Sequence, residues 1–220
     1  RTSTPHDRSS GNLHLNMNPK LFLTLWSFRK ELKFVFLAFM TILMVPVIGV
    51  ILLTRVGINI ISDKLVESNP TTQSIEIKDP TSGEVVKSIS PQVVWPVHGV
   101  ITLEFGQSSL YQIFHTGIDI ANPSGKIGDP ITPAMDGEVV YAGEIFWGYG
   151  KHVIIDHGNN ITSVYAHLDK IYVYKGQKVT ITDTIGKEGQ TGWATGPHLH
   201  FETRIYGIPV KQRVFLRKPS

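Results

Sequence analysis

The distribution of apolar residues divides the chain into two parts. Residues 34–53, FVFLAFMTILMVPVIGVILL, form an uncharged apolar run of twenty residues. At 1.5 Å per residue, a helix of that length covers about the 30 Å hydrocarbon core of a membrane. From about residue 93 the pattern changes to short runs of alternating apolar and polar residues, separated by Gly, Pro, Asn and Asp. Such runs predict strands joined by turns. We therefore expect one transmembrane helix at 34–54 and a strand-rich domain at 93–220.

The charges beside the apolar run predict its orientation. Four basic residues, Lys20, Arg29, Lys30 and Lys33, precede the run, and Arg55 and Lys64 follow it more sparsely. The positive-inside rule then places residues 1–33 in the cytoplasm as a tail and the remaining chain outside the cytoplasmic membrane. A buried helix or a signal-peptide core are the alternatives. The run is longer than a typical secretory core, and no small-x-small cleavage site follows Leu53.

The segments around the anchor carry weaker signals. Trp26 and Phe28 are candidates for an aromatic anchor at the membrane interface. His6 and His14 fall in a Ser-, Thr-, Asn- and Pro-rich stretch that is typical of a solvated tail. Residues 55–92 read as an extracytoplasmic linker, in which SIEIKDPTSGEVVKSI (74–89) predicts a small hairpin or an extended stalk.

The fold class of residues 93–220 follows from the spacing of the predicted strands. The short gaps between GVITLEF, GEVVYAG, HVIIDHG, ITSVYAHL, KIYVYKG and HLHFETRI leave little room for crossover helices. Neighbouring strands should therefore pair antiparallel. We expect a compact all-β domain, large enough to bury a core.

Composition limits the chemistry available to this domain. The chain has no cysteine, which excludes disulfide frameworks, thiolate metal sites and cysteine nucleophiles. Any metal must be held by His, Asp or Glu. The net charge of +3, with a sequence pI near 9.0, is too small to indicate a nucleic-acid partner, and no basic cluster is interleaved with aromatic residues.

Two histidines one residue apart are the first candidate site. In GPHLHFE (196–202), Leu199 and Phe201 alternate with polar neighbours, as in a strand. His198 and His200 would then project from one face, about 7 Å apart along the chain. Such a pair suits a metal or proton-transfer site, but histidines on the exposed face of an edge strand have the same sequence pattern.

Three further residues extend this candidate. His115 and Asp119, in FHTGIDIANP, are four residues apart, a spacing that puts both side chains on one face of either a helix or a strand. His167, in SVYAHL, is the fifth member. Each has a structural alternative: His115 could cap a turn, Asp119 could be an ordinary loop carboxylate, and His167 could be a hydrogen-bonded core histidine. Hydrolytic zinc sites without cysteine need three N or O ligands and an open position for water, and the set of five supplies enough ligands.

The order of the motifs resembles one family. HTGID (115–119), DGEVVYAG (136–143), YGKHVIIDHG (149–158), YAHL (165–168), KGQKV (175–179) and GQTGWATGPHLHFE (189–202) closely resemble the LytM-type, or lysostaphin-like, zinc metallopeptidases over residues 95–208. The chain departs from the family pattern at TITDTIG and at GIPVKQRVFL. Both departures lie outside the histidine and aspartate motifs, so they affect local loops.

The resemblance implies a compact antiparallel β domain with a groove that has zinc at its floor. Matched motif by motif, His115, Asp119 and His200 would be the zinc ligands, and His167 and His198 the catalytic histidines. The implied substrate is bacterial peptidoglycan, cut in its stem or cross-bridge peptides. Which histidine acts as base or acid, and which bond is cut, stay open.

The remaining candidates are secondary. Glu202 shares the strand face of the histidine pair and is a candidate to orient a ligand. His152 and His157 fit a strand and a turn better than the site, and His98 has no partner in sequence. Gly192 and Gly196 predict turns beside the groove.

Two other functions fit the same motifs. One is a non-catalytic module that binds the cell wall or regulates a separate hydrolase. The other is a wall-opening enzyme of a phage or a conjugation system, which differs only in its biological context.

Overall fold

The computed structural model describes residues 19–69, 71–72, 74–89, 93–109 and 112–216. The chain forms two compact units, one up to Val50 and one from Ile51 onward. Most of the predicted cytoplasmic tail, with His6 and His14, and the side chain of Trp26 lie outside the described residues.

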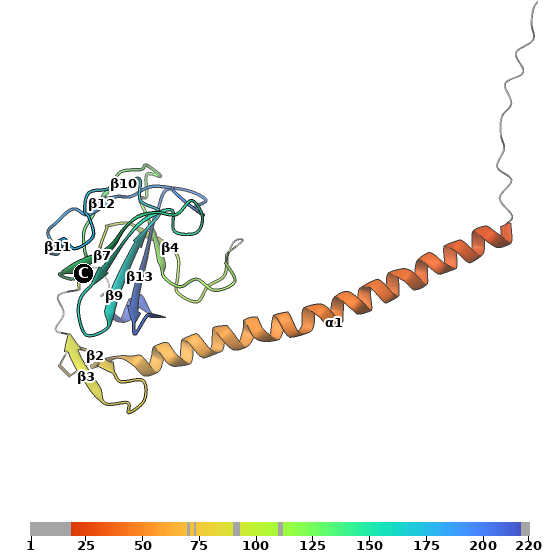
Figure 1. Ribbon diagram of the computed structural model, residues 1–220, viewed down its shortest axis with the longest axis horizontal. Coiled ribbons are helices and arrows are strands. Elements are labelled where there is room, and N and C mark those ends of the chain that lie inside the picture. The colour runs from red at the N-terminus through yellow and green to blue at the C-terminus, as the bar shows by residue number, and fades with distance from the viewer. Residues whose placement is uncertain (1–18, 70, 73, 90–92, 110–111, 217–220) are drawn as a thin grey trace, which may run out of the picture. The chain divides into compact units, whose positions relative to one another are not determined.

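One long helix carries the apolar run. Helix α1 (Pro19–Leu65) begins well before the predicted span of 34–54 and continues beyond it (Figure 1). The flanking Leu, Lys, Arg and Glu residues are good helix formers, so no signal stops the helix at either end of the run. Pro46 lies inside the helix and removes only one backbone hydrogen bond. Large apolar side chains stay exposed along it, with Ile42 and Leu53 each 74% exposed.

The region predicted as a linker is ordered structure. After α1 ends at Leu65, the chain forms a three-stranded antiparallel sheet from β1 (Val66–Asn69), β2 (Ser74–Lys78) and β3 (Val85–Ile89). The hairpin predicted at 74–89 is confirmed. Its turn is closed by Asp79, whose Oδ1 accepts hydrogen bonds from the backbone N–H of Thr81 (2.8 Å) and Ser82 (2.9 Å). The extended-stalk alternative is therefore excluded.

The rest of the chain is an antiparallel β domain, as predicted. Its large sheet has the order β11-β7-β8-β9-β13-β5-β4, with β14 on β13, and a small sheet has the order β10-β12-β6. The strands are β4 (Val100–Leu103), β5 (Ile118–Ala121), β6 (Pro130–Ile131), β7 (Gly137–Glu144), β8 (Lys151–Asp156), β9 (Ile161–Ala166), β10 (Lys170–Ile171), β11 (Lys178–Val179), β12 (Gly186–Lys187), β13 (Leu199–Ile205) and β14 (Ile208–Val210), followed by the 3-10 turn η1 (Gln212–Val214). Alternation along these strands buries one face: Ile118 and Ile120 of β5 are both fully buried.

Two apolar clusters hold the second unit together. The larger one fills the β domain and includes Ile120, Tyr165 and Phe201. The smaller one joins residues from the end of α1 and from β2 to the β domain, with Ile77 and Phe215 among its members. Residues 51–89 are therefore packed onto the β domain and share a core with it.

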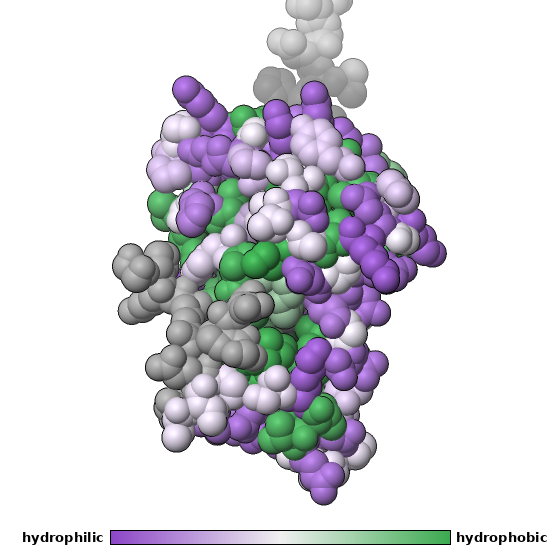
Figure 2. All heavy atoms as spheres, turned by 90° about the vertical axis from the view of Figure 1, so that its left-hand side faces the viewer, coloured by the Kyte–Doolittle hydropathy of each residue, from purple (hydrophilic) through white to green (hydrophobic). Residues whose placement is uncertain are grey.

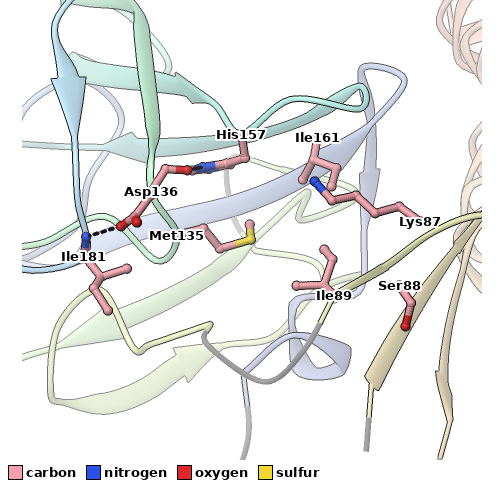
Figure 3. Close-up of a pocket in the computed structure, with 8 residues that line it drawn as sticks. All are labelled: Lys87, Ser88, Ile89, Met135, Asp136, His157, Ile161 and Ile181. Carbon is pink, nitrogen blue, oxygen red and sulfur yellow. Dashed lines mark hydrogen bonds between the residues drawn. The ribbon is translucent and has the colours of Figure 1, made fainter. Parts of the chain in front are cut away.

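A surface pocket lies where the hairpin meets the domain. It has a volume of about 320 Å³ and is lined by Lys87, Ser88, Ile89, Met135, Asp136, His157, Ile161 and Ile181 (Figure 3). Figure 2 shows apolar residues reaching the surface near the middle of one face, next to hydrophilic residues. The sequence-predicted site lies in another pocket, on the strands at the centre of the large sheet.

Candidate metal centre

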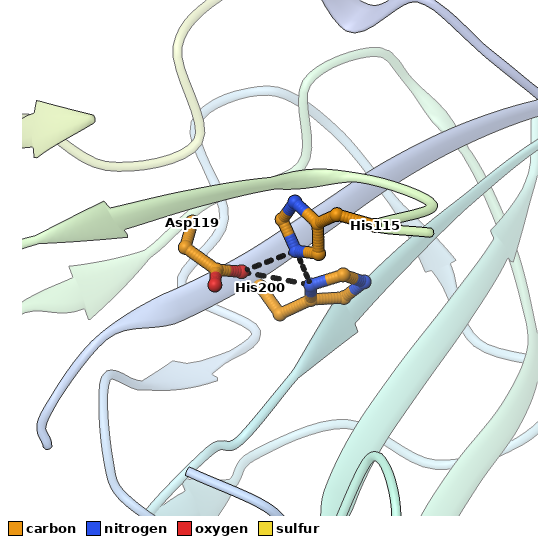
Figure 4. A group of neighbouring side chains, drawn as sticks. All are labelled: His115, Asp119 and His200. Carbon is orange, nitrogen blue, oxygen red and sulfur yellow. Dashed lines mark hydrogen bonds and ion pairs between the residues drawn. The ribbon is translucent and has the colours of Figure 1, made fainter. Parts of the chain in front are cut away.

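Strand pairing brings the three predicted ligands together. Strand β13 lies between β5 and β9, and His200 on β13 is the direct cross-strand neighbour of Asp119 on β5. His115 lies just before β5, and its ring reaches the same point (Figure 4). Among the described residues these three form the one group of His, Asp or Glu side chains whose ligand atoms lie within 4.8 Å of one another.

The distances within the group are short. Asp119 Oδ1 lies 2.9 Å from His115 Nε2 and 2.8 Å from His200 Nδ1. The two ring nitrogens are 2.9 Å apart. Both rings are almost completely buried, whereas the Asp119 side chain is 14% exposed. Three ligand atoms therefore converge on one point that remains reachable from solvent.

In both histidines, the ring nitrogen that faces away from Asp119 has a hydrogen-bond partner that orients the ring. His115 Nδ1 lies 3.2 Å from the backbone carbonyl of Glu104, and His200 Nε2 lies 3.0 Å from the carboxylate of Glu202. Carbonyl and carboxylate oxygens only accept hydrogen bonds, so these outer nitrogens carry the protons of the neutral rings. The inner nitrogens then present lone pairs toward each other and toward Asp119.

Such an arrangement requires a cation. In the metal-free protein a proton fills this role: burial alone would lower the pKa of His200, but its hydrogen bonds to Asp119 and Glu202 raise that pKa to about 9. Burial likewise opposes ionisation of Asp119, yet the two histidines hold the pKa of its carboxyl well below the usual range. Two imidazole nitrogens and one carboxylate are a ligand set that hydrolytic zinc sites use, so the residues fit that metal.

The two predicted catalytic histidines lie beside this group. His198 Nε2 is 3.6 Å from Asp119 Oδ2. The ring centroids of His167 and His198 are 4.7 Å apart, and those of His167 and His200 are 5.7 Å apart. His167, His198 and His200 therefore line one pocket of about 290 Å³, together with Asp119 and Trp193.

Backbone carbonyls also fix the tautomers of this second pair. His167 Nδ1 lies 2.7 Å from the carbonyl of Thr191, and His198 Nδ1 lies 2.8 Å from that of Gly196. The protons therefore sit on Nδ1, and Nε2 is the atom that can accept a proton. Burial, followed by repulsion from His200 and His198, lowers the pKa of His167 to about 3. That ring is neutral at physiological pH.

Two glycines allow the loop that holds His167 to approach the groove. Gly150 and Gly192 both have positive φ, at +61° and +70°. A Cβ on Gly150 would lie 2.4 Å from the backbone of Thr191, whose carbonyl orients His167. His167 itself has a φ of +63°, a conformation that costs energy for a residue with a side chain. The prediction that Gly192 supports this wall agrees with its contact with Gly148.

The other residues discussed above separate into two groups. Glu202 contacts His200, in agreement with its predicted role of orienting a ligand. His152 instead stacks on Tyr141 with a 4.4 Å centroid distance. His157 bonds the carbonyl of Asp136 at 2.8 Å, in the pocket beside the hairpin.

Sequence reasoning missed the residues that surround Glu202. Tyr149, Thr116 and Arg204 all bond its carboxylate. For Arg204 a signal was present, because it continues the period-two face of His198, His200 and Glu202 along β13. For Tyr149 and Thr116 the contact depends on a loop conformation that no periodicity encodes.

Comparison with known proteins agrees with this geometry. The model of the family described as Peptidase family M23 matches residues 113–212, which contain all five site residues. The chain belongs to peptidase family M23. Its β domain and His-Asp-His group are thus those of a metallopeptidase family whose members include lysostaphin-like enzymes, as the motifs predicted.

Three relatives of this M23 chain illustrate the range of the family. It is 46% identical over 96 residues to the peptidoglycan DD-endopeptidase ShyA of Vibrio cholerae, covering 44% of this chain and 21% of ShyA. It is 38% identical over 122 residues to the murein hydrolase activator NlpD of Salmonella dublin, covering 56% of this chain and 30% of NlpD. The crystal structure of a zinc-containing peptidase from Vibrio cholerae matches with a TM-score of 0.52 and 28% identity, covering 69% of this chain and 48% of that one. The chain thus spans less than half the length of each.

Proposed function

We propose that this protein is a membrane-anchored zinc metalloendopeptidase that hydrolyses peptide bonds in the stem or cross-bridge peptides of bacterial peptidoglycan. The observation that carries the proposal is the complete set of converging groups: His115, Asp119 and His200 as zinc ligands, with His167 and His198 beside them. The M23 family membership supports the same substrate class.

The chemistry divides between the metal and the protein. When bound, zinc would supply a Lewis acid that polarises the scissile carbonyl and lowers the pKa of a water molecule. The Nε2 atoms of His167 and His198 would accept the proton of that water and donate a proton to the departing amine. Their Nδ1–H groups, held by the carbonyls of Thr191 and Gly196, keep both rings in the orientation this transfer requires.

Helix α1 supports the anchored part of the proposal. Residues 31–65 of this helix are long and apolar enough to cross a membrane, and their most apolar part is not buried in the protein. A signal sequence has the same two properties. Exposed Ile, Leu, Val and Phe side chains along residues 34–54 would be covered by lipid. With residues 1–33 in the cytoplasm, residues 55–92 and the catalytic domain at 93–220 would face the periplasm or cell wall, where peptidoglycan lies.

A pair of substitutions at neighbouring histidines tests the activity. His200→Ala should abolish stoichiometric zinc binding and activity together, because it removes a ligand. His198→Ala should keep zinc and lose hydrolysis by a factor of about 10² or more, because it removes a proton-transfer group. Zinc content is measured by atomic emission, and cleavage by mass spectrometry of peptidoglycans with different cross-bridges.

The relative named as a murein hydrolase activator defines the competing function. If the wild-type chain binds zinc but releases no new amino termini from any peptidoglycan, the regulatory or wall-binding function is correct and the enzymatic proposal is wrong. Zinc retention by His200→Ala would overturn the ligand assignment.

A further inference from the structure

Glu202 is a buried carboxylate surrounded by hydrogen-bond donors. Its side chain is fully buried on β13. Oε1 accepts hydrogen bonds from Thr116 Oγ1, from the Tyr149 hydroxyl at 2.7 Å and from His200 Nε2 at 3.0 Å. Oε2 accepts from Arg204 Nε at 2.7 Å and also pairs with Arg204 Nη2 at 2.6 Å. Both oxygens of the carboxylate thus accept hydrogen bonds from more than one donor atom.

Arg204 offsets the free-energy cost of burying the Glu202 carboxylate and fixes its position. Its guanidinium neutralises the carboxylate, and its Nη2 also donates to the Tyr149 hydroxyl at 2.8 Å. The Tyr149 hydroxyl then donates to Glu202, which closes a ring of three side chains. A buried ion pair of this kind is tolerated only where its remaining hydrogen-bonding groups are satisfied, as they are here.

The contact with His200 decides which of its nitrogens carries the proton. A carboxylate cannot donate, so His200 Nε2 must carry a hydrogen to bond with it. In the neutral ring, Nδ1 then has the free lone pair. Nδ1 is the atom that lies 2.8 Å from Asp119 Oδ1 and 2.9 Å from His115 Nε2.

We propose that Glu202 is a positioning residue, held by Arg204 and Tyr149, which keeps His200 in the tautomer that presents Nδ1 to zinc. This inference rests on the proposed function, because it takes His200 as a zinc ligand. Tyr149 and Arg204 act through Glu202 and do not touch the metal.

An isosteric substitution separates this role from simple packing. In Glu202→Gln the amide can present its oxygen to Arg204 or to His200, but not to both. The permanently charged guanidinium is the stronger donor. The amide NH₂ would then face His200 Nε2, which must become an acceptor and transfer its proton to Nδ1. We expect zinc affinity to fall by about 10- to 100-fold, the usual effect of removing an outer partner of a ligating histidine.

A second substitution should reverse the first. In the double variant Glu202→Gln with Arg204→Met, no guanidinium competes for the amide oxygen, which can again accept from His200. The uncompensated positive charge near the metal also disappears. Zinc affinity should recover by about tenfold relative to Glu202→Gln, a coupling that neighbouring residues with a shared partner commonly show. A packing role predicts the opposite, because the double variant loses two sets of contacts.

Glu188 provides a matched control, since it is also fully buried and its described side-chain hydrogen bond goes to Asn122 and to none of the proposed ligands. Its Oε1 accepts from the backbone of Asn122, and Glu188→Gln should leave zinc affinity unchanged. Affinities of the full chain in detergent are measured by competition with a chromophoric chelator, with circular dichroism to confirm folding.

The outcomes distinguish the inference from the proposed function. If the wild-type chain does not bind zinc, the proposed function fails. If the wild type binds zinc and Glu202→Gln binds it equally, or if the double variant is no better than the single one, the positioning role fails. Should Glu202→Gln not fold, Tyr149→Phe removes one donor to Glu202; weaker zinc binding then supports the inference, and unchanged affinity overturns it.

Discussion

At the scale of single residues, the site is organised by where each histidine keeps its proton. Backbone carbonyls hold the Nδ1 protons of His115, His167 and His198, whereas a buried carboxylate holds the Nε2 proton of His200. The histidine with the different partner, His200, is also the one whose Nδ1 rather than Nε2 faces Asp119 and the neighbouring ring. The neighbouring atoms thus set which nitrogen each ring presents to the site: Nε2 in His115, His167 and His198, and Nδ1 in His200.

The raised pKa of His200 predicts how zinc binding depends on pH. With a pKa of about 9, the ring is protonated in the metal-free protein at neutral pH, so zinc must displace a proton. Apparent zinc affinity should rise about tenfold per pH unit between pH 6 and pH 8 and level off near pH 9. Chelator competition at several pH values measures this, and an affinity that stays constant over the range would contradict it.

The same shift predicts an opposite trend for the metal-free fold. The pKa of His200 in the folded state lies above the value of about 6.5 expected in the unfolded chain. Its stabilising contribution is therefore complete below pH 6.5 and is lost as pH rises toward 9. Denaturant unfolding of the metal-free protein across this range should show the decline, which zinc saturation should remove.

At the scale of elements, the site depends on strand register and on one pair of loops. The β5–β13–β9 pairing aligns Asp119, His200 and Ala166, and His167 follows directly at the end of β9. The loop at 145–150 and the segment at 189–193 then close over the end of β9. Trp193 N–H donates to the carbonyl of Gly148 at 2.9 Å across this junction.

Two glycines of the same loop test this junction. Gly150→Ala forces a Cβ into the backbone of Thr191, so we expect a loss of stability above the 1–2 kcal/mol typical of positive φ alone, together with a lower kcat as His167 loses its orientation. Zinc binding should persist, because the ligands lie elsewhere. Gly148→Ala is the control: its φ is also positive, at +56°, but the described residues leave its Cβ free of contacts within 4 Å. Equal effects of the two substitutions would refute the close-approach explanation.

At the scale of the whole molecule, the segment between the apolar helix and the β domain is part of the folded unit. Arg55 of α1 donates to the carbonyl of Gly106 at 2.8 Å, and Ser62 accepts from the backbone of Lys211 at 3.0 Å. Gly106 N–H in turn donates to the carbonyl of the predicted ligand His115 at 2.8 Å. The helix end is thus connected to the loop that carries one of the metal-binding side chains.

This packing predicts that the hairpin and the β domain unfold together. Ile77→Ala should cost about 2–5 kcal/mol, because Ile77 is fully buried in the cluster that joins the two parts. Val85→Ala, at a site 49% exposed, should cost little. Denaturant unfolding followed by tryptophan fluorescence should give one transition for both variants. A separate early transition in Ile77→Ala would show that the hairpin is an independent unit.

The absence of cysteine makes the proposed membrane orientation directly measurable. A single cysteine replacing Ser124, in the β domain, should react with a membrane-impermeant maleimide in cells whose outer barrier has been opened. A cysteine replacing Ser9 should react only after lysis. The reverse pattern would mean that the β domain is cytoplasmic, and release of the Ser124→Cys protein into the medium would indicate cleavage of a signal sequence.

The sequence by itself determined the features that depend on local pattern and on residue type. The apolar run predicted the helix, alternation predicted an antiparallel β domain, and the ordered motifs around His115, Asp119, His167, His198 and His200 predicted the site residues that the structure brings together. These features can be recognised in the sequence alone because periodicity reflects burial and because metal chemistry restricts the residue types.

Only the tertiary structure decided the rest. The packing of the end of α1 and of the hairpin depends on contacts with the β domain, which no local pattern encodes. The split between His198 and His200 was inferred from a resemblance and stays a prediction. The structure decides how the two rings differ: Asp119 and Glu202 lie at opposite nitrogens of His200, whereas His198 Nδ1 faces a carbonyl. Residues as distant in sequence as Tyr149 and Arg204 meet at one carboxylate only after the sheet has formed.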